Sequence, residues 1–430
     1  MKKGALLALV ASAVFASVFS ARVIGQQGEI SSPQQARGGP AVTLPDGPGK
    51  DLVQANCAKC HGLNMITNYW GDTRQGWETL FGSMVALPAD QKSAISNYLA
   101  THFPVKQVPA AKIINGPVQV TFKEFAAPTL GSRPHDPLAA NDGSIWWSGH
   151  FGNKLGRVDP RTGAVKEYPL NPGAGPHGLV EDSSGNIWYT GIYGHHVGKL
   201  DPKTGQITEY KMPDPKMRSP HTPIFDAKGN LWFTLQSGMV GRIVPSTGEV
   251  KVVGTPTPSA QTYPYGIQIN SKGVPWYVDF RGPRIASVDP NTMAIKEITL
   301  PNAESRPRRI ALTPDDKVWY ADYTRGYLGM YDPATNTFKE WASPGGPQSE
   351  PYGIATIGNI VWYSESNVRP NTMVRFDPQT QQFQTWAIPS GGHVVRNMMR
   401  TKDGNGIVIA ESGINKVALV EIGRGSNRTN

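Results

Sequence analysis

A block of alternating apolar and polar positions recurs along most of this chain. In each block a short apolar strand follows a proline, a tight turn comes next, and an aromatic strand follows, as in Gly185–Tyr189 and Gly229–Phe233. Alternation of this kind predicts half-buried β-strands. Tryptophan marks the aromatic strand of six blocks at intervals of 42, 44, 44, 43 and 43 residues: Trp146, Trp188, Trp232, Trp276, Trp319 and Trp362. A seventh block carries Val408 in that position.

Each block continues with a third strand that ends near an Asp-Pro turn and with a fourth strand, such as Lys166–Tyr168. Four strands at such a period form one propeller blade. The chain therefore predicts an all-β, seven-bladed propeller over residues 118–423, followed by a tail at 424–430. The last block stops after its third strand, and the fourth-strand pattern stands instead at Lys123–Phe125. We expect this N-terminal strand to complete the last blade and cover its exposed edge.

The repeat array resembles the virginiamycin B lyase (streptogramin lyase) family of seven-bladed propellers. The resemblance implies a C–O lyase in which a histidine acts as base and carboxylates hold Mg²⁺. The family's pattern E-P-H-G-I, followed by an aromatic strand that ends in Glu, matches Glu350–Ile354 and Trp362–Glu365. Both carboxylates match, but Tyr352 stands where the family has histidine. Glu350 and Glu365 are a candidate site for Mg²⁺ or another divalent cation.

The first strands of the seven blocks should all begin on one rim of the central channel. The residues at these starting positions are His135, His177, His221, Tyr265, Arg308, Tyr352 and Arg396. Convergent polar side chains at the mouth of a ring predict a binding site for a small-molecule substrate. The candidate catalytic residues are His135, His177, His221, Arg308, Tyr352 and Arg396, and the three histidines are also candidate metal ligands. The alternative is a solvated rim with internal ion pairs.

The N-terminus has the pattern of an export signal. Two lysines follow Met1, and an apolar run extends from Gly4 to Ser20 before small residues. This predicts a signal peptide over residues 1–25 and a flexible polar leader over 26–46. We therefore expect a periplasmic protein. The alternative is an uncleaved signal that anchors the chain in the membrane.

Both cysteines of the 430-residue chain lie in Cys57-Ala58-Lys59-Cys60-His61. This is the C-x-x-C-H attachment signature of a c-type haem. Cys57 and Cys60 would form thioethers to one covalent haem c, and His61 would ligate the iron. The alternatives are a chance occurrence of the motif and a redox dithiol of thioredoxin type.

Residues 47–104 resemble a small, all-α cytochrome c domain. Helical patterns at Lys50–Asn56 and Gln91–Phe103 flank the cysteine motif and end the domain. Met84, seven residues after Trp77, is the candidate sixth ligand of the iron. Met65 lies only four residues past His61, too close in sequence to reach the opposite face of the haem. The alternative is that Met84 packs in the core and the sixth position is open or bound by another group. Residues 105–117 form a proline-containing linker to the propeller.

The charge pattern narrows the choice of partners. The formal net charge is +9, but basic and acidic residues are interspersed without a polybasic run. This pattern argues against nucleic-acid binding. A mildly basic surface can instead steer an acidic redox partner.

Three functions fit the sequence. The first is a periplasmic mono-haem cytochrome that transfers electrons to or from a periplasmic redox protein or a membrane electron-transfer complex. In its stronger form the chain is a haem-dependent oxidoreductase whose propeller binds the substrate. The second is a streptogramin lyase-like, Mg²⁺-dependent C–O lyase with an appended cytochrome. The third is a non-catalytic propeller scaffold that docks the cytochrome on a dehydrogenase.

Overall fold

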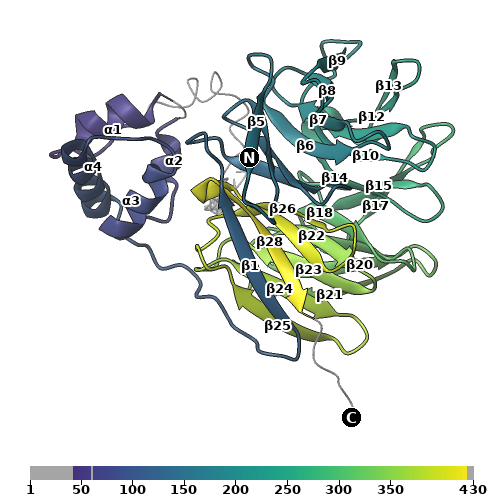
Figure 1. Cartoon of the computed structure of the whole chain (residues 1–430). Coiled ribbons are helices and arrows are strands. Elements are labelled where there is room, and N and C mark those ends of the chain that lie inside the picture. Colours follow the sequence, from purple (N-terminus) through teal and green to yellow (C-terminus); the bar gives the residue numbers. More distant parts are fainter. Residues whose placement is uncertain (1–41, 60–61, 424–430) are drawn as a thin grey trace, which may run out of the picture.

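The computed structural model describes residues 42–59 and 62–423, which form a small helical part beside a ring of β-sheets (Figure 1). The signal peptide, most of the leader, Cys60, His61 and the C-terminal tail lie outside the described residues. Within the described ranges, no helix is long and apolar enough to cross a membrane. The helices are α1 (Lys50–Cys57), α2 (Asn64–Thr67), α3 (Arg74–Gly82) and α4 (Ala89–His102).

The helical part has its own apolar core. Val53 of α1, Trp77 of α3 and Leu99 of α4 are buried in it together. The Trp77 indole N–H donates to the backbone oxygen of Phe103 at 3.0 Å, which satisfies its polar group inside the core. Leu44, which precedes α1, is also buried here, so packing begins upstream of the first helix. The expected helices before the cysteine motif and at the end of this region are confirmed.

The ring consists of seven blades, each a four-stranded antiparallel sheet. The expected seven-bladed propeller is therefore confirmed. The first six blades contain, from the inner to the outer strand, β2 (Pro134–Ala139), β3 (Ile145–Gly149), β4 (Lys154–Val158) and β5 (Val165–Pro169); β6 (Pro176–Glu181), β7 (Ile187–Gly191), β8 (His196–Leu200) and β9 (Ile207–Lys211); β10 (Pro220–Phe225), β11 (Leu231–Leu235), β12 (Met239–Val244) and β13 (Glu249–Gly254); β14 (Pro264–Ile269), β15 (Pro275–Asp279), β16 (Arg284–Val288) and β17 (Ile295–Thr299); β18 (Pro307–Leu312), β19 (Val318–Asp322), β20 (Tyr327–Asp332) and β21 (Thr337–Ala342); β22 (Pro351–Ile357), β23 (Ile360–Glu365), β24 (Thr372–Asp377) and β25 (Gln382–Ala387).

The seventh blade joins the two ends of the propeller, as the sequence predicts. It contains β26 (Val395–Arg400), β27 (Gly406–Glu411), β28 (Lys416–Gly423) and, on its outer edge, β1 (Gln119–Ala126). β1 pairs with β28 in an unbroken antiparallel register from Gln119↔Gly423 to Ala126↔Lys416. An ion pair of 2.7 Å between Lys123 and Glu421 crosses the same pair of strands. The pairing covers the strand edge that the last blade would otherwise expose.

Aromatic residues of the second strand and glycines of the third strand pack against one another inside four blades. Tyr189 of β7 lies opposite Gly198 of β8, and a Cβ atom at Gly198 would overlap the tyrosine ring. The same pairing joins Trp147 to Gly156, Phe233 to Gly241 and Tyr320 to Gly329. In three of these blades the neighbouring tryptophan stacks on an aromatic residue of the fourth strand: Trp146 on Tyr168, Trp188 on Tyr210 and Trp319 on Trp341, with ring centroids 5.2, 5.1 and 5.5 Å apart. The first, second and fifth blades, which have both contacts, are thereby packed on both faces.

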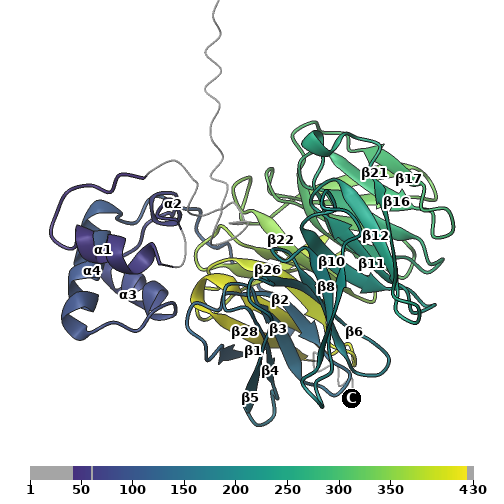
Figure 2. The ribbon, with the colours of Figure 1, turned by 90° about the horizontal axis from the view of Figure 1, so that it is seen from above.

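The helical part docks on the side of the propeller where the inner strands begin, beside the last blade (Figure 2). All of its propeller contacts named below come from loops of that side. Tyr69 Oη lies 3.1 Å from His393 Nδ1, and Arg369 forms an ion pair of 3.1 Å with Asp72. Ile414 of the propeller is buried in the helical core. The two parts therefore share an apolar and hydrogen-bonded interface.

Replacing Gly198 by Ala should lower the free energy of unfolding by about 1–3 kcal/mol, because the added methyl group overpacks the Tyr189 ring. Thermal unfolding followed by circular dichroism measures the change. Gly254→Ala is the matched control, since no atom lies within 4 Å of the position its Cβ would occupy. Equal melting temperatures for the two variants would contradict this packing.

Candidate functional site

The seven residues that begin the inner strands meet around the channel mouth, and none is more than 3% exposed. Four of their rings, from four neighbouring blades, form a continuous row of tilted ring contacts. Ring centroids are 3.7 Å apart between His135 and His177, 3.9 Å between His177 and His221, and 3.8 Å between His221 and Tyr265. The structure thus brings the three sequence-predicted histidines together. The mouth is packed side chain against side chain.

The other half of the mouth is built around a buried arginine. The guanidinium of Arg308 lies 3.9 Å from the ring centroid of Tyr352, 4.4 Å from that of Phe280 and 4.5 Å from that of Tyr323. Cation–π contacts of this kind stabilise a guanidinium that has lost its water. The hydroxyl of Tyr352 lies 2.6 Å from that of Tyr265, to which Arg308 Nε also donates at 3.3 Å. Tyr352 is therefore held from two sides.

One residue further along the inner strands, a second polar layer spans the channel. Arg309 donates to Asp136 Oδ1 at 2.7 Å, and Asn397 donates to Asp136 Oδ2 at 2.9 Å. These contacts connect blades five and seven to blade one. Burial alone would raise the pKa of Asp136, but Arg309 and the hydrogen bond from His135 outweigh it and hold this pKa well below the usual range. Asp136 is thus a buried carboxylate that ties the blades together.

Sequence reasoning did not identify this layer. The residues after the starting positions are Asp136, Gly178, Thr222, Gly266, Arg309, Gly353 and Asn397. Glycine occupies three of these seven positions, so the polar residues at the remaining positions were a signal that could have been noticed. The sequence also showed no sign of the aromatic residues around Arg308. Phe280 and Tyr323 come directly after the second strands of their blades, and only the path of the following loops brings them to the mouth.

His135, Asp136 and His177 could hold a metal ion. One possible ligand atom of each lies within 4.8 Å of those of the other two, and all three residues are buried. Two imidazoles and a carboxylate suit a transition metal better than Mg²⁺. Arg309 occupies the Asp136 oxygen that also accepts from His135, so a cation would have to compete with a guanidinium for this ligand.

The carboxylates of Glu350 and Glu365 differ in their surroundings. Glu365 accepts hydrogen bonds from the Ser343 hydroxyl at 2.6 Å, the Gly345 backbone N–H at 2.5 Å and the Thr372 hydroxyl at 2.6 Å. Its carboxylate therefore links the loop after β21 to β24 by hydrogen bonds. Glu350 accepts from the Tyr323 hydroxyl at 2.5 Å.

These two carboxylates do not fit the magnesium ion that the lyase resemblance implies. Mg²⁺ needs carboxylate oxygens that are open to it. Both oxygens of Glu365 already accept hydrogen bonds, and Glu350 faces the positive charges of Arg308 and Arg396. We derive no step through a metal at these residues.

Glu350 is nevertheless unusual. Burial raises its pKa to about 7, although Tyr323, Arg308 and Arg396 all act in the opposite direction. A carboxyl group with a pKa near neutrality can both take up and release a proton under physiological conditions. Glu350, whose carboxylate accepts from the Tyr323 hydroxyl beside the mouth, is therefore a candidate for proton transfer.

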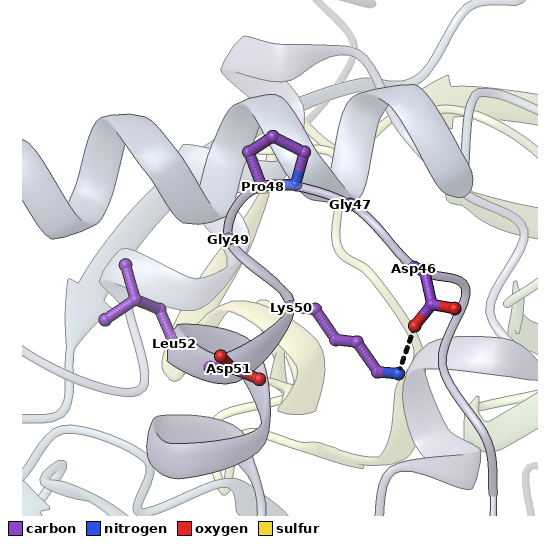
Figure 3. A pocket seen from close by; sticks show the side chains of 7 residues that line it. All are labelled: Asp46, Gly47, Pro48, Gly49, Lys50, Asp51 and Leu52. Atoms are coloured by element: carbon purple, nitrogen blue, oxygen red, sulfur yellow. Dashed lines mark hydrogen bonds and ion pairs between the residues drawn. The ribbon is translucent and has the colours of Figure 1, made fainter.

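The proposed haem ligands that the structure describes lie around one core. Cys57 ends α1, and Met84 follows α3; both pack, partly buried, against the cluster that contains Trp77. Cys60 and His61 lie outside the described residues. A shallow hollow elsewhere in the helical part is lined by Asp46–Leu52, where Lys50 and Asp46 form an ion pair of 2.7 Å (Figure 3). It contains none of the candidate residues.

Because the pKa of Glu350 is raised, the free energy of unfolding should depend on pH in a defined way. Between pH 4.5 and about 7 the folded protein holds a proton that an unfolded glutamate has released, so the wild type loses stability as the pH rises through this window. Glu350→Gln should remove this loss, at most about 1.4 kcal/mol per pH unit. Urea unfolding from pH 4.5 to 8 measures it, with Glu304→Gln at an exposed position as control. Parallel profiles for the wild type and Glu350→Gln would contradict the prediction.

Comparisons with known proteins agree on the propeller. The sequence profile of the virginiamycin B lyase family matches residues 101–369. No curated protein matches the chain. Among solved structures, a streptogramin B lyase superposes with a TM-score of 0.64 at 24% identity, covering 71% of this chain and 98% of its own. Virginiamycin B lyase from Staphylococcus aureus superposes with a TM-score of 0.63 at 22% sequence identity, and the match covers 70% of this chain and 99% of that protein. Hydrazine synthase from Kuenenia stuttgartiensis superposes with a TM-score of 0.56 at 14% sequence identity, and the match covers 69% of this chain and 97% of that chain.

These structural likenesses confirm the fold, and the matched profile spans more than half of the chain. The chain belongs to the virginiamycin B lyase family.

Proposed function

We propose that this protein is a periplasmic mono-haem c-type cytochrome that transfers electrons, joined to a lyase-family propeller that binds a small-molecule substrate. The observation that carries the proposal is the C-x-x-C-H motif at residues 57–61, which contains every cysteine of the chain. A covalent one-electron centre serves electron transfer, or sensing through it.

The described residues of the helical part fit a haem. Cys57 and Met84 come from different segments and reach the same apolar core, which is the environment a haem needs. Cys57 and Cys60 would hold the porphyrin, with His61 and Met84 as axial ligands. The haem would supply a centre that accepts and releases one electron. Trp77 and Leu99 would exclude water from that core.

The docking of the helical part supports the stronger form of this proposal, a haem-dependent oxidoreductase. Its contacts lie on the side of the propeller where the mouth residues begin. His393, which meets Tyr69, is three residues before Arg396 of the mouth. A substrate held at the mouth would thus be on the same side as the helical part. The electron partner would be a periplasmic redox protein or a membrane electron-transfer complex that meets the exposed surface of the helices.

The haem proposal is tested on the purified holoprotein. Haem should remain bound after denaturation and acid–acetone extraction, because thioether bonds survive both treatments. Met84→Ala should abolish the sulfur-to-iron charge-transfer band of the oxidised protein, whereas Met65→Ala should leave it in place. Extractable haem would overturn the proposal, and an unchanged band in Met84→Ala would assign the sixth ligand to another residue.

A streptogramin lyase is the second candidate, and family membership is the observation that favours it. Lyase chemistry needs a base, and Tyr352 replaces the family's histidine. Phenols are protonated at neutral pH and are weaker bases than imidazole there. Glu350 would have to take the proton instead. We favour the redox function because the mouth lacks the imidazole at this position and open carboxylates for Mg²⁺.

Incubation with quinupristin, the ligand of a crystallised virginiamycin B lyase variant, separates the two candidates. We expect the antibiotic to remain intact with the wild-type protein, with and without an added electron acceptor, as followed by liquid chromatography and mass spectrometry. Ring opening by the wild type without an acceptor, and its loss in Glu350→Gln, would establish the lyase instead.

A further inference from the structure

The loop that joins the closing strand β1 to β2 meets the helical part at Met84, the candidate sixth ligand of the haem iron. The Gly131 backbone N–H in this loop donates to the Ser83 backbone oxygen at 3.0 Å. A Cβ atom at Gly131 would lie 3.1 Å from the Met84 backbone oxygen, and the φ angle of this glycine is +66°. Glycine adopts such an angle at no steric cost and lets two backbones approach closely. The propeller therefore lies directly against the main chain at Ser83 and Met84.

A second propeller segment packs on the same part of the helical core. Ile414 of the short 3₁₀ helix η3 (Ser412–Ile414) is buried in the apolar cluster that contains Trp77. Cys57 and Met84 pack, partly buried, against this cluster. η3 also contacts α3, the helix that Met84 follows. Two segments of the propeller thus contact α3 and the residues directly after it.

Asn415 joins these two propeller segments. It follows η3, is buried, and has a φ angle of +58°. Its side-chain amide donates to the backbone oxygens of Ala127 and Thr129, each at 3.0 Å, and its side-chain oxygen accepts from the Arg133 backbone N–H at 3.0 Å. A buried polar side chain with these partners fixes the backbone segments that it connects. The loop is thereby fastened to η3 on both sides of Gly131.

The helical part by itself holds Met84 from one side. The Met84 backbone N–H donates to the Phe81 backbone oxygen at 2.9 Å, which continues the last turn of α3. Residues 85–88 form neither helix nor strand before α4 begins at Ala89. A segment without regular secondary structure keeps its place through tertiary contacts. The hydrogen bond from Gly131 is such a contact.

We propose that the propeller positions Met84 as the sixth ligand of the haem iron. Gly131 and Ile414 are positioning residues for this ligand, and Asn415 fixes both of them. The inference rests on the proposed cytochrome function and adds that the propeller sets the reduction potential of the haem. A thioether ligand raises this potential, and contacts behind a ligand orient it and tune the metal. Loss of a propeller contact should therefore loosen the sulfur and lower the potential.

Redox titration of the full-length holoprotein tests the proposal, with the sulfur-to-iron charge-transfer band recorded on the same samples. Gly131→Ala should weaken the band and lower the potential, because the added methyl group displaces the Met84 main chain. We expect a decrease of about 59 mV, the one-electron equivalent of a tenfold loss in the preference of sulfur for reduced iron. Gly143→Ala is the matched control. Gly143 lies in the turn between β2 and β3 and also has a positive φ angle, +81°, but no atom lies within 4 Å of its Cβ position.

Two further variants keep the test independent of how Gly131→Ala folds. Ile414→Ala should lower the potential as well, with Ile243→Ala in β12 as the control for loss of a buried side chain. Asn415→Ala should lower it at least as far, because it releases both propeller segments.

Covalent haem whose potential and band are unchanged in Gly131→Ala, Ile414→Ala and Asn415→Ala would overturn this inference alone. Equal shifts in the two control variants would overturn it too, since they would assign the effect to general destabilisation. Extractable haem in the wild type would overturn the redox function, and this inference with it.

Discussion

The pairing of β1 with β28 is the interaction on which the rest of this structure depends. The seven inner strands converge on one channel only if the ring closes, and the closing strand comes from the N-terminal side of the propeller. The chain that leads to β1 is held as well, since Ala110 bridges to Arg369 and the Ile114 N–H donates to Thr385 Oγ1 at 2.7 Å. Closure therefore also fixes where the helical part attaches. It attaches on the mouth side, near the first and the last two blades.

The mouth that closure creates is stabilised differently from an open polar cleft. Its histidine rings contact one another, Arg308 is packed on aromatic rings, and Arg309 is paired with Asp136. Low exposure makes each of these charges sensitive to its neighbours. The same burial that raises the pKa of Glu350 to about 7 leaves the Arg396 Nε without a partner. The electrostatics of the mouth are consequently set by a balance of buried charges.

The contact between the two parts is nearly free of net charge. Burial, together with Arg369, lowers the pKa of His393 to about 4, and burial raises that of Tyr69 to about 12, so their hydrogen bond joins two neutral side chains at neutral pH. Arg369 compensates Asp72 and lies 4.8 Å above the Tyr69 ring. Because neither side chain changes its charge near neutral pH, this contact should keep the helical part in the same position relative to the mouth over a broad pH range.

The sequence by itself determined the number of blades, the strand order and the closing strand, because each follows from a repeat whose period is carried by tryptophans such as Trp188 and Trp319. It also determined which residues begin the inner strands, and hence that His135, Arg308 and Tyr352 share one rim. Only the tertiary structure decided what these residues do there. Sequence spacing could not show that both oxygens of Glu365 accept hydrogen bonds from neighbouring segments, that Asp136 binds Arg309 across the ring, or that the helical part attaches on the mouth side. Those outcomes depend on contacts between blades distant in sequence, where burial and competing partners, rather than spacing, set the charge and reach of each side chain.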